Sequence, residues 1–249
     1  MQEIQQPKVQ VRSLTKKFGD LLVLNDISFD VQPGEFLCIV GPTGCGKTTF
    51  LNSLTKLYQP TSGEILLDGE PVDLQRHNIA YIFQEYSTMP WLTVEENVGF
   101  GLHIKGVEKS KANALVEEYL EIVGLTKYRK YYPDQLSASM LQRVVIARAF
   151  ATQPDLLLMD EPYGQLDIQL RYKLEDELIS LWKRTGTTVL FITHNIEEAV
   201  YMGQRILVLT NKPTSIKRSI ENTLPRPRDI ASPDFVALRN EVTDLIKWW

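Results

Sequence analysis

The chain has 249 residues, of which 43% are hydrophobic and 23% are charged, and it carries a formal net charge of −4. This length suits one large globular domain with room for a short appendage, and the acidic balance excludes nucleic acid as an expected partner. Because the chain has only two cysteines and no secretory signal, we expect no disulfide framework and a location in the reducing cytosol. It also has no apolar run long enough to cross a bilayer, so we expect that the protein, if it works at a membrane, does so as a peripheral subunit.

The first part of the chain predicts antiparallel strands and then a buried strand. Residues 8–32 alternate apolar and polar positions around a turn at Gly19-Asp20. Residues 36–40 (FLCIV) form an unbroken apolar run, which is typical of a strand buried on both faces. A helix is expected next, with apolar residues at helical spacing: Phe50, Leu51, Leu54 and Leu57.

The remaining elements predict alternating strands and helices. In chain order we expect a hairpin around Asp68-Gly69, a strand over 79–84, helices over 93–130 with breaks near Gly106 and Gly124, and then a helix capped by Ser137 with Leu141, Val144 and Val145 on one apolar face. These are followed by a strand over 156–160, a helix over about 168–185, a strand over 188–193 and a hairpin turning at residues 211–213. A last helix is expected after Ser232-Pro233, with apolar residues at helical spacing: Phe235, Leu238, Val242, Leu245 and Ile246. This alternation predicts an α/β fold with a mainly parallel sheet.

A glycine-rich segment after the strand at 36–40 predicts a phosphate-binding loop. Its sequence fits G-x-x-x-x-G-K-[ST] in the strand–loop–helix context that the motif requires. Glycines let backbone N–H groups converge on phosphate oxygens, and the helix N-terminus adds partial positive charge. We expect Lys47 to neutralise the β- and γ-phosphates and the Thr48 hydroxyl to bind Mg²⁺. The expected ATP-binding residues are Gly41, Pro42, Thr43, Gly44, Cys45, Gly46, Lys47, Thr48 and Thr49.

Two interpretations of Cys45, which lies inside this loop, stay open. In the first it is a small spacer whose side chain points away from the phosphates. In the second, Lys47 and the helix end lower the pKa of its thiol, so that alkylation slows nucleotide binding and Mg-ATP protects.

Two acidic residues follow the predicted buried strand at 156–160 (LLLMD). This position lets Asp160 hold Mg²⁺ beside the phosphate loop and lets Glu161 polarise a water that attacks the γ-phosphate. His194 follows the strand over 188–193 and is expected at the same sheet edge, where α/β proteins form their sites. The alternatives are a surface turn for the two acids and a structural or surface role for the histidine.

These motifs together resemble ATP-binding cassette (ABC) ATPases over nearly the whole chain up to about residue 225. GPTGCGKTT matches Walker A, LLLMDEP matches Walker B with Glu161 as the catalytic carboxylate, and LSASMLQR matches the signature motif. Phe18 matches the aromatic residue that stacks on adenine, and Gln84 matches the Q-loop glutamine that senses Mg²⁺ and the transmembrane partner. His194 matches the switch histidine, and Asp167 in GQLD matches the D-loop.

The resemblance implies a P-loop NTPase fold of the ABC type. Such a fold has a RecA-like, mainly parallel core sheet, an N-terminal antiparallel β subdomain and a helical subdomain. The implied boundaries are 8–225 for the ATPase domain, about 86–150 for its helical subdomain, and 226–249 for a short C-terminal linker and helix.

The resemblance also implies that two cassettes, identical or different, pack head to tail around ATP. Ser137, Ala138, Ser139 and Asp167 of one cassette would then act on the nucleotide of the other. The signature departs from LSGGQ, because Ala138 and Ser139 replace its glycines and Met140 its glutamine. A Cβ there would cost about 1–2 kcal/mol if a left-handed backbone were needed. Two interpretations stay open: a working but altered phosphate sensor, and a regulatory or paired subunit that binds ATP but hydrolyses it poorly.

The segment after Gln84 is expected to contact a membrane partner. Tyr86, Met89, Pro90 and Trp91 form an apolar cluster with Leu92, where this family receives a coupling helix of a transmembrane permease; internal packing is the alternative. FQEYSTMPWLTVEENV and LPRPRD resemble importer ATPases for nitrate, sulfonate, taurine and related solutes. This implies ATP and Mg²⁺ as cofactors, a separate permease and an extracytoplasmic solute-binding protein as partners, and a peripheral position on the cytoplasmic face of the cell membrane.

Other nucleotide-binding classes fit less well. DNA-repair and chromosome-organising ATPases carry a long coiled coil between the Q-loop and the signature, whereas about 50 residues separate them here. Ribosome-associated ABC factors usually hold two cassettes in one chain. A GTPase needs Asn-Lys-x-Asp, but Asn211-Lys212 is followed by Pro213-Thr214. A small-molecule kinase would lack the signature and the switch histidine.

Overall fold

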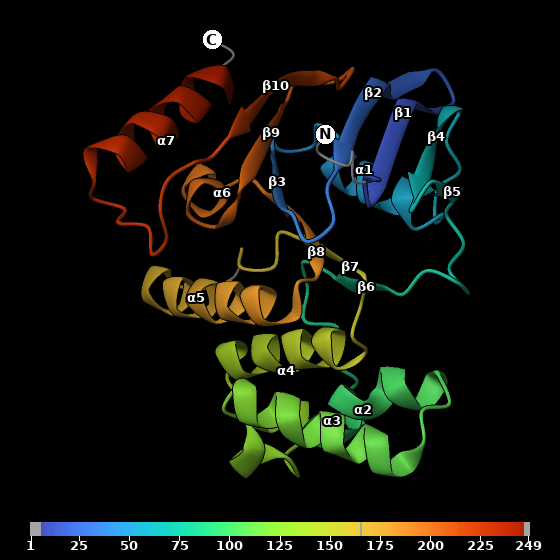
Figure 1. The fold of residues 1–249 in the computed structure, drawn as a ribbon, viewed down its shortest axis with the longest axis vertical. Helices are drawn as coiled ribbons and strands as arrows, with labels where there is room; N and C mark the ends of the chain where they lie inside the picture. Colours follow the sequence, from blue (N-terminus) through green and yellow to red (C-terminus); the bar gives the residue numbers. More distant parts are fainter. Residues whose placement is uncertain (1–5, 165, 247–249) are drawn as a thin grey trace, which may run out of the picture. The chain divides into compact units, whose positions relative to one another are not determined.

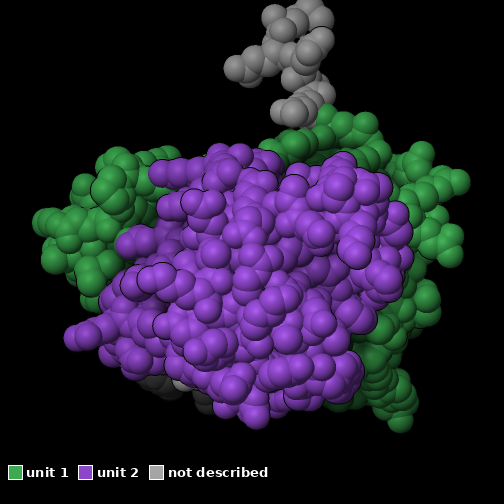
Figure 2. All heavy atoms as spheres, turned by 90° about the horizontal axis from the view of Figure 1, so that it is seen from below, with its two compact units in different colours: residues 1–77, 188–249 green, residues 78–187 purple. Residues whose placement is uncertain are grey.

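The computed structural model describes residues 6–164 and 166–246, which form two compact units (Figure 2). Unit 1 comprises residues 1–77 and 188–249, and unit 2 comprises residues 78–187. Within the described ranges, no helix combines the length and apolar character needed to span a membrane. The predicted boundaries at residues 86, 150 and 225 stay predictions, and residues 247–249 of the predicted C-terminal segment lie outside the described residues.

Unit 1 contains a four-stranded antiparallel sheet in the order β2-β1-β4-β5, which confirms the predicted N-terminal strands and hairpin (Figure 1). Its strands are β1 (Val9–Phe18), β2 (Leu21–Val31), β4 (Ser62–Leu67) and β5 (Glu70–Pro71). A glycine is required at position 63, because its φ is +80° and a Cβ there would lie 2.3 Å from the Ser13 carbonyl oxygen. The close approach of β1 and β4 therefore depends on this residue.

The second sheet segment of unit 1 has a parallel core. β3 (Phe36–Val40) lies between β8 (Thr188–Thr193) and β9 (Arg205–Leu209) and is parallel to both, and β10 (Ile216–Glu221) pairs with β9 in antiparallel fashion. Every residue of β3 and β8 is buried, as their apolar runs predict. Among the described residues of this unit, the helices are α1 (Lys47–Leu54), α6 (Ile196–Met202) and α7 (Pro233–Ile246).

Unit 2 combines a parallel strand pair with a group of helices. β6 (Ile79–Ile82) pairs with β7 (Leu156–Asp160). The helices are α2 (Val94–Ile104), α3 (Lys109–Ile122), α4 (Ala138–Ala151) and α5 (Ile168–Thr185), with short 3-10 turns η1 (Thr126–Tyr128) and η2 (Pro133–Gln135). α4 contacts α2, α3, α5 and β6, so it lies at the centre of this unit.

The structure corrects two sequence-based expectations about helices. α1 ends at Leu54, and Leu57 is 65% exposed instead of continuing its apolar face. The positive φ of Lys56, 58°, shows where the chain leaves the helical path. Burial of α4 also extends beyond the one apolar face expected from Leu141, Val144 and Val145, because every residue from Val144 to Ala147 is buried and the helix has neighbours on several sides.

A third difference is α6, which the sequence analysis did not anticipate. Its signals are an N-cap asparagine, Asn195, followed by two acids in the first turn, Glu197 and Glu198. With only seven residues, α6 is too short to show an apolar periodicity.

Candidate functional site

The predicted phosphate-binding loop lies in unit 1, between β3 and α1. Gly46 is the N-cap of α1 with φ +119°, and a Cβ there would approach Val23 Cγ1 to 2.9 Å. The Cys45 N–H donates to the Pro42 carbonyl at 3.1 Å, and the Thr214 hydroxyl donates to the Cys45 carbonyl. These contacts fix a tight loop that opens onto a helix N-terminus with no acidic residue in its first turn, a favourable place for an anion.

Lys47 brings a positive charge to this loop. Its buried side chain donates from Nζ to the carbonyl oxygens of Gly41 at 3.0 Å and Pro42 at 3.2 Å. Thr43, Gly44 and Thr48 are exposed at the same loop. The structure therefore brings together an ammonium group, accessible backbone and the Thr48 hydroxyl, as predicted for a phosphate site.

Cys45 does not have the lowered pKa that one interpretation assigned to it. The residue is 2% exposed, and this burial raises the pKa of the thiol more than the nearby charge of Lys47 lowers it. A Cβ on Gly41 would lie 3.0 Å from the Cys45 Sγ, so the thiol packs against Gly41. The side chain is therefore an uncharged packing group, which agrees with the spacer interpretation.

Unit 1 also places two other predicted residues. Phe18 ends β1, is 43% exposed, and meets the Tyr58 ring edge to face with centroids 5.3 Å apart. Lys16 Nζ lies 4.8 Å from the centroid of the Phe18 ring. His194 is exposed directly after β8. An exposed aromatic ring and an exposed imidazole are thus both present in this unit, and their nucleotide contacts stay predictions.

The two predicted acids lie in unit 2, at the end of β7. Asp160 is buried, and the Tyr81 hydroxyl donates to its Oδ2 at 3.4 Å. Burial and the negative charge of Asp160 together raise the pKa of Tyr81, so the phenol stays protonated as a donor. Glu161 has a left-handed backbone with φ 48°, a conformation that is rare for a residue with a side chain and that is often found at functional sites.

The signature residues begin α4 without backbone strain. Ser137 is the N-cap and accepts from the Met140 N–H at 3.4 Å, and its Oγ lies 3.1 Å from Ser139 Oγ. Ala138 and Ser139 have helical backbone and no positive φ, so the cost of a left-handed conformation does not arise in this structure. Asp167 similarly caps α5 by accepting from the Leu170 N–H at 2.9 Å.

The predicted permease cluster is only partly exposed. Trp91 is 72% exposed and Pro90 is exposed, whereas Tyr86, Met89 and Leu92 are half-buried. Trp91 and Leu92 border a groove of about 680 Å³ between α2 and α3. Its other lining residues include Phe100, Val107, Ala112 and Val116.

Two further residues of unit 2 shape this region, and sequence reasoning did not name them. Asn97 is completely buried in α2 and bonds the backbone of residues 89–93. Arg148 of α4 donates to the carbonyl oxygen of Ser87 at 2.7 Å and to its Oγ at 2.6 Å. A TVEE capping box before α2 was a usable signal for the helix start, but the sequence carried none for these long-range contacts.

The proposed metal ligands suit Mg²⁺ in their chemistry. The Thr48 hydroxyl, the Asp160 carboxylate and the Gln84 side-chain carbonyl all offer oxygen, which this hard cation prefers. In the part of the chain that the structure describes, no group of three or more His, Cys, Asp or Glu side chains could hold a metal by itself. Mg²⁺ commonly takes one or two protein oxygens and completes its shell with phosphates and water, so this sparse donor set fits it.

Comparisons with known proteins agree on one family. The ABC transporter family model matches residues 24–164. The aliphatic sulfonates import ATP-binding protein of Bacillus cereus is 42% identical over 229 residues, which are 92% of this chain and 90% of that protein. A dimeric bacterial ABC transporter cassette is 32% identical with a TM-score of 0.75, covering 86% of this chain and 98% of that one. A dimeric post-hydrolysis state of the same cassette, bound to ADP and Pi, covers the same shares at 32% identity and gives a TM-score of 0.74.

The family model spans more than half of the chain, and the sulfonate-import relative covers most of its length. The α/β architecture with a parallel core and a separate antiparallel sheet is that of an ABC cassette. This chain therefore belongs to the ABC transporter family and is an ATPase cassette that binds and hydrolyses ATP.

Proposed function

We propose that this cassette energises the uptake of a small solute, of the nitrate, sulfonate or taurine type or related to these, through a separate transmembrane permease. Identity of 42% to an aliphatic sulfonates import protein over 92% of the chain supports the importer class. A solute-binding protein outside the membrane would deliver the solute, and the cassette would sit on the cytoplasmic face of the membrane. The main observation that supports the role in ATP hydrolysis is the loop around Lys47, whose Nζ lies 3.0 Å from the Gly41 carbonyl oxygen.

ATP binding would use the exposed surface of this loop. Backbone N–H groups of residues 43–48 would bind phosphate oxygens, and Lys47 would exchange its two carbonyl acceptors for the β- and γ-phosphates. Phe18 would stack on the adenine. Mg²⁺, held by Thr48, Asp160 and Gln84, would supply positive charge that offsets the developing charge on the phosphates.

Hydrolysis would depend on Glu161 and His194. Glu161 would accept a proton from the attacking water, and His194 would donate a hydrogen bond to the γ-phosphate. Water lacks nucleophilic strength at neutral pH, so removal of the carboxylate should stop the chemical step and leave ATP binding intact. The left-handed backbone at Glu161 supports this assignment, because a strained residue is retained where its position matters.

The nucleotide would also join two cassettes. The solved relative is dimeric, and a head-to-tail pair would bring Ser137, Ala138 and Ser139 to the γ-phosphate of the partner, with Asp167 nearby. The unstrained start of α4 and its accessible serine hydroxyl support a working, altered signature. The first N–H groups of this helix would bind the phosphate in trans.

The permease would dock at the segment formed by Tyr86, Met89, Pro90 and Trp91. An exposed tryptophan beside an apolar groove of about 680 Å³ is suited to a short amphipathic helix from a transmembrane subunit. Trp91→Ala should abolish co-purification with the permease and leave the Kd for ATP unchanged. Assembly that survives this change would place the docking surface elsewhere.

The central experiment compares Glu161→Gln and Lys47→Ala with the unaltered protein. We expect Glu161→Gln to bind Mg-ATP, lose hydrolysis and form a stable dimer, and Lys47→Ala to lose binding. Light scattering with and without permease gives the oligomeric state. A Glu161→Gln protein that stays monomeric at saturating Mg-ATP in both conditions would refute the shared-nucleotide dimer. Sulfonate-stimulated hydrolysis in the reconstituted transporter then tests the solute class.

A further inference from the structure

Helix α6 follows His194 directly, and its first residues hold the backbone on both sides of that histidine. The Asn195 N–H donates to Thr193 Oγ1 at 2.9 Å, and the Thr193 hydroxyl donates to Glu198 Oε2 at 2.6 Å. The Asn195 side chain caps the helix by accepting from the Glu197 N–H at 2.9 Å. The place of His194 is therefore tied to the place of α6.

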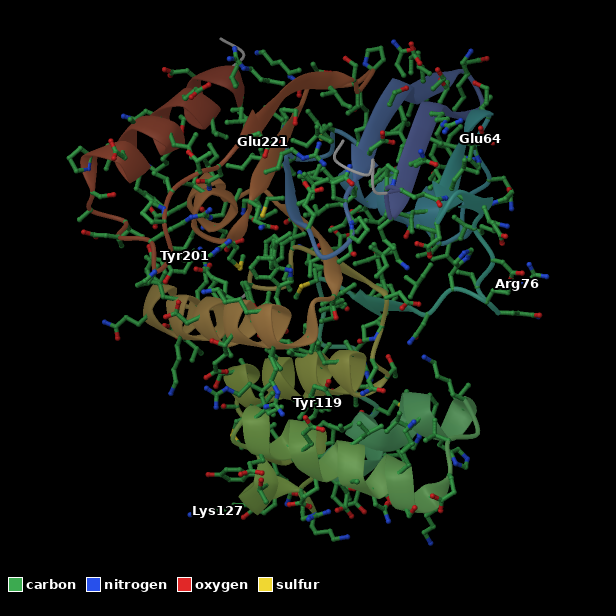
Figure 3. The ribbon with its side chains drawn as sticks, viewed as in Figure 1. Glu64, Arg76, Tyr119, Lys127, Tyr201 and Glu221 are labelled. Carbon is green, nitrogen blue, oxygen red and sulfur yellow. The ribbon has the colours of Figure 1, made fainter. Side chains whose placement is uncertain are left out.

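The C-terminal end of α6 is held by arginines from a distant part of the chain. Arg228 Nη1 donates to the carbonyl oxygens of Val200 at 2.8 Å, Tyr201 at 2.9 Å and Gly203 at 2.7 Å. Arg226 donates to the carbonyls of Tyr201, at 3.1 Å, and Met202. Tyr201 is labelled in Figure 3. Four successive carbonyls at this helix end thus face two guanidinium groups.

These contacts suit the electrostatics of a helix end. The last carbonyls of a helix have no partner within it, and their partial negative charge favours cations. Arg228 is only 8% exposed, and burial lowers its pKa to about 10, so it stays charged at neutral pH. A helix of seven residues gains little stability from its own hydrogen bonds. Its position therefore depends on tertiary contacts, which are the packing of its buried residues against β3, β8 and α7 and the hydrogen bonds at its two ends.

Helix α7 also contacts α6, and the two helices lie side by side in unit 1 (Figure 1). Arg239 of α7 lies 3.5 Å from the carboxylate of Glu197 in the first turn of α6. Asn222, at the end of β10, donates to the Val200 carbonyl at 2.8 Å. The segment 222–239 therefore contacts both ends of α6, although it lies beyond residues 24–164, which the family model matches.

We propose that Arg226 and Arg228 are positioning residues for ATP hydrolysis, which hold α6 by its last carbonyls and thereby fix the backbone of His194. The C-terminal segment is then a working part of the catalytic machinery of this cassette. This inference rests on the proposed role of His194. It predicts slower chemistry with unchanged nucleotide affinity, because the phosphate-binding loop makes none of these contacts.

The first test substitutes the arginines and measures binding and turnover separately. For Arg228→Met we expect kcat to fall about tenfold and the Kd for a fluorescent ATP analogue to stay within about twofold. Arg228→Lys keeps the positive charge but loses the forked donors of the guanidinium group. Its kcat should therefore lie between that of the unaltered protein and that of Arg228→Met. Arg76→Met is the matched control, because Arg76 is exposed and pairs with Glu70 and Asp73 at 3.7 Å, which belong to neither α6 nor α7. Amide exchange over residues 195–203 should speed up in the Arg228 variants and not in the control.

A double-mutant test separates positioning from general destabilisation. If Arg228 acts through His194, Arg228→Met should not slow the residual hydrolysis of a His194→Ala protein any further. An equal loss in both backgrounds, or unchanged kcat in Arg228→Met and Arg228→Lys, would overturn the proposal. If His194→Ala alone hydrolyses ATP normally, the proposed role of His194 fails. If His194→Ala is slow and the arginine variants are normal, only the positioning role fails.

Discussion

Asn97 offers a direct test of how the loop that carries Trp91 is held. This buried side chain accepts from the Met89 N–H at 2.8 Å and donates to the carbonyl oxygens of Met89 at 3.1 Å, Leu92 at 3.0 Å and Thr93 at 3.0 Å. Its amide has only two hydrogens for three carbonyls, so one donor bond is shared. The four contacts therefore count as about three hydrogen bonds, each with a net value of about 1 kcal/mol.

Asn97→Ala should lower the free energy of unfolding by roughly 2–3 kcal/mol, because the higher helix propensity of alanine offsets only about 0.5 kcal/mol. Urea titrations followed by circular dichroism, with unchanged m-values, measure this difference. Asn113→Ala is the matched control, since Asn113 is an exposed asparagine on the neighbouring helix α3. A loss below about 1 kcal/mol for Asn97→Ala, or one equal to the control, would refute the view that these bonds hold the loop.

Three other changes test separate features. The buried Cys45 thiol, with its raised pKa, should react with iodoacetamide at pH 8 far more slowly than in urea, and equal rates would contradict its burial. Ser139→Gly should cost about 0.5–1 kcal/mol of stability and change kcat less than about threefold; a large rise in kcat would instead indicate a weakened signature. Burial would raise the pKa of Glu95, but hydrogen bonds from Lys130 and Arg129 outweigh it and lower that pKa. Its folded-state pKa lies below the unfolded value, so its stabilisation is present at pH 7 and lost in acid. The difference in urea midpoint between Glu95→Gln and the unaltered protein should therefore shrink as the pH falls from 7 through the folded-state pKa of Glu95, and a difference that grows on acidification would contradict this sign.

The elements that could be predicted from the sequence are those with local sequence signals. The apolar runs at residues 36–40 and 188–193 predicted buried strands, and both are buried at every position. Ser137 and Ser232 predicted helix starts, and each hydroxyl accepts a backbone N–H of the helix that follows. The phosphate loop was recognisable because a fixed spacing of glycines and lysine is itself the structural requirement.

The features that could not be predicted from the sequence depend on long-range contacts. Burial of Cys45 decides the direction of its pKa shift, and no pattern in the loop reports how deep the thiol lies. The partners of Arg228 at the end of α6 are about 25 residues earlier in the chain and are backbone carbonyls, which have no residue type to recognise. The left-handed backbone of Glu161 could not be predicted from the sequence either, because a glutamate rarely adopts this conformation.

The tight backbone bonding around Trp91 has a consequence for the speed and strength of complex formation. A partner that meets a mobile loop must first bring it to order, and that entropy is subtracted from the affinity. Here the indole projects from a segment whose backbone is hydrogen-bonded at Met89 and Leu92, so the proposed docking of a permease would restrict little more than two side-chain torsions. A small contact area around one aromatic ring could then suffice for a lasting attachment, and an encounter would need no slow rearrangement of this loop before it becomes productive.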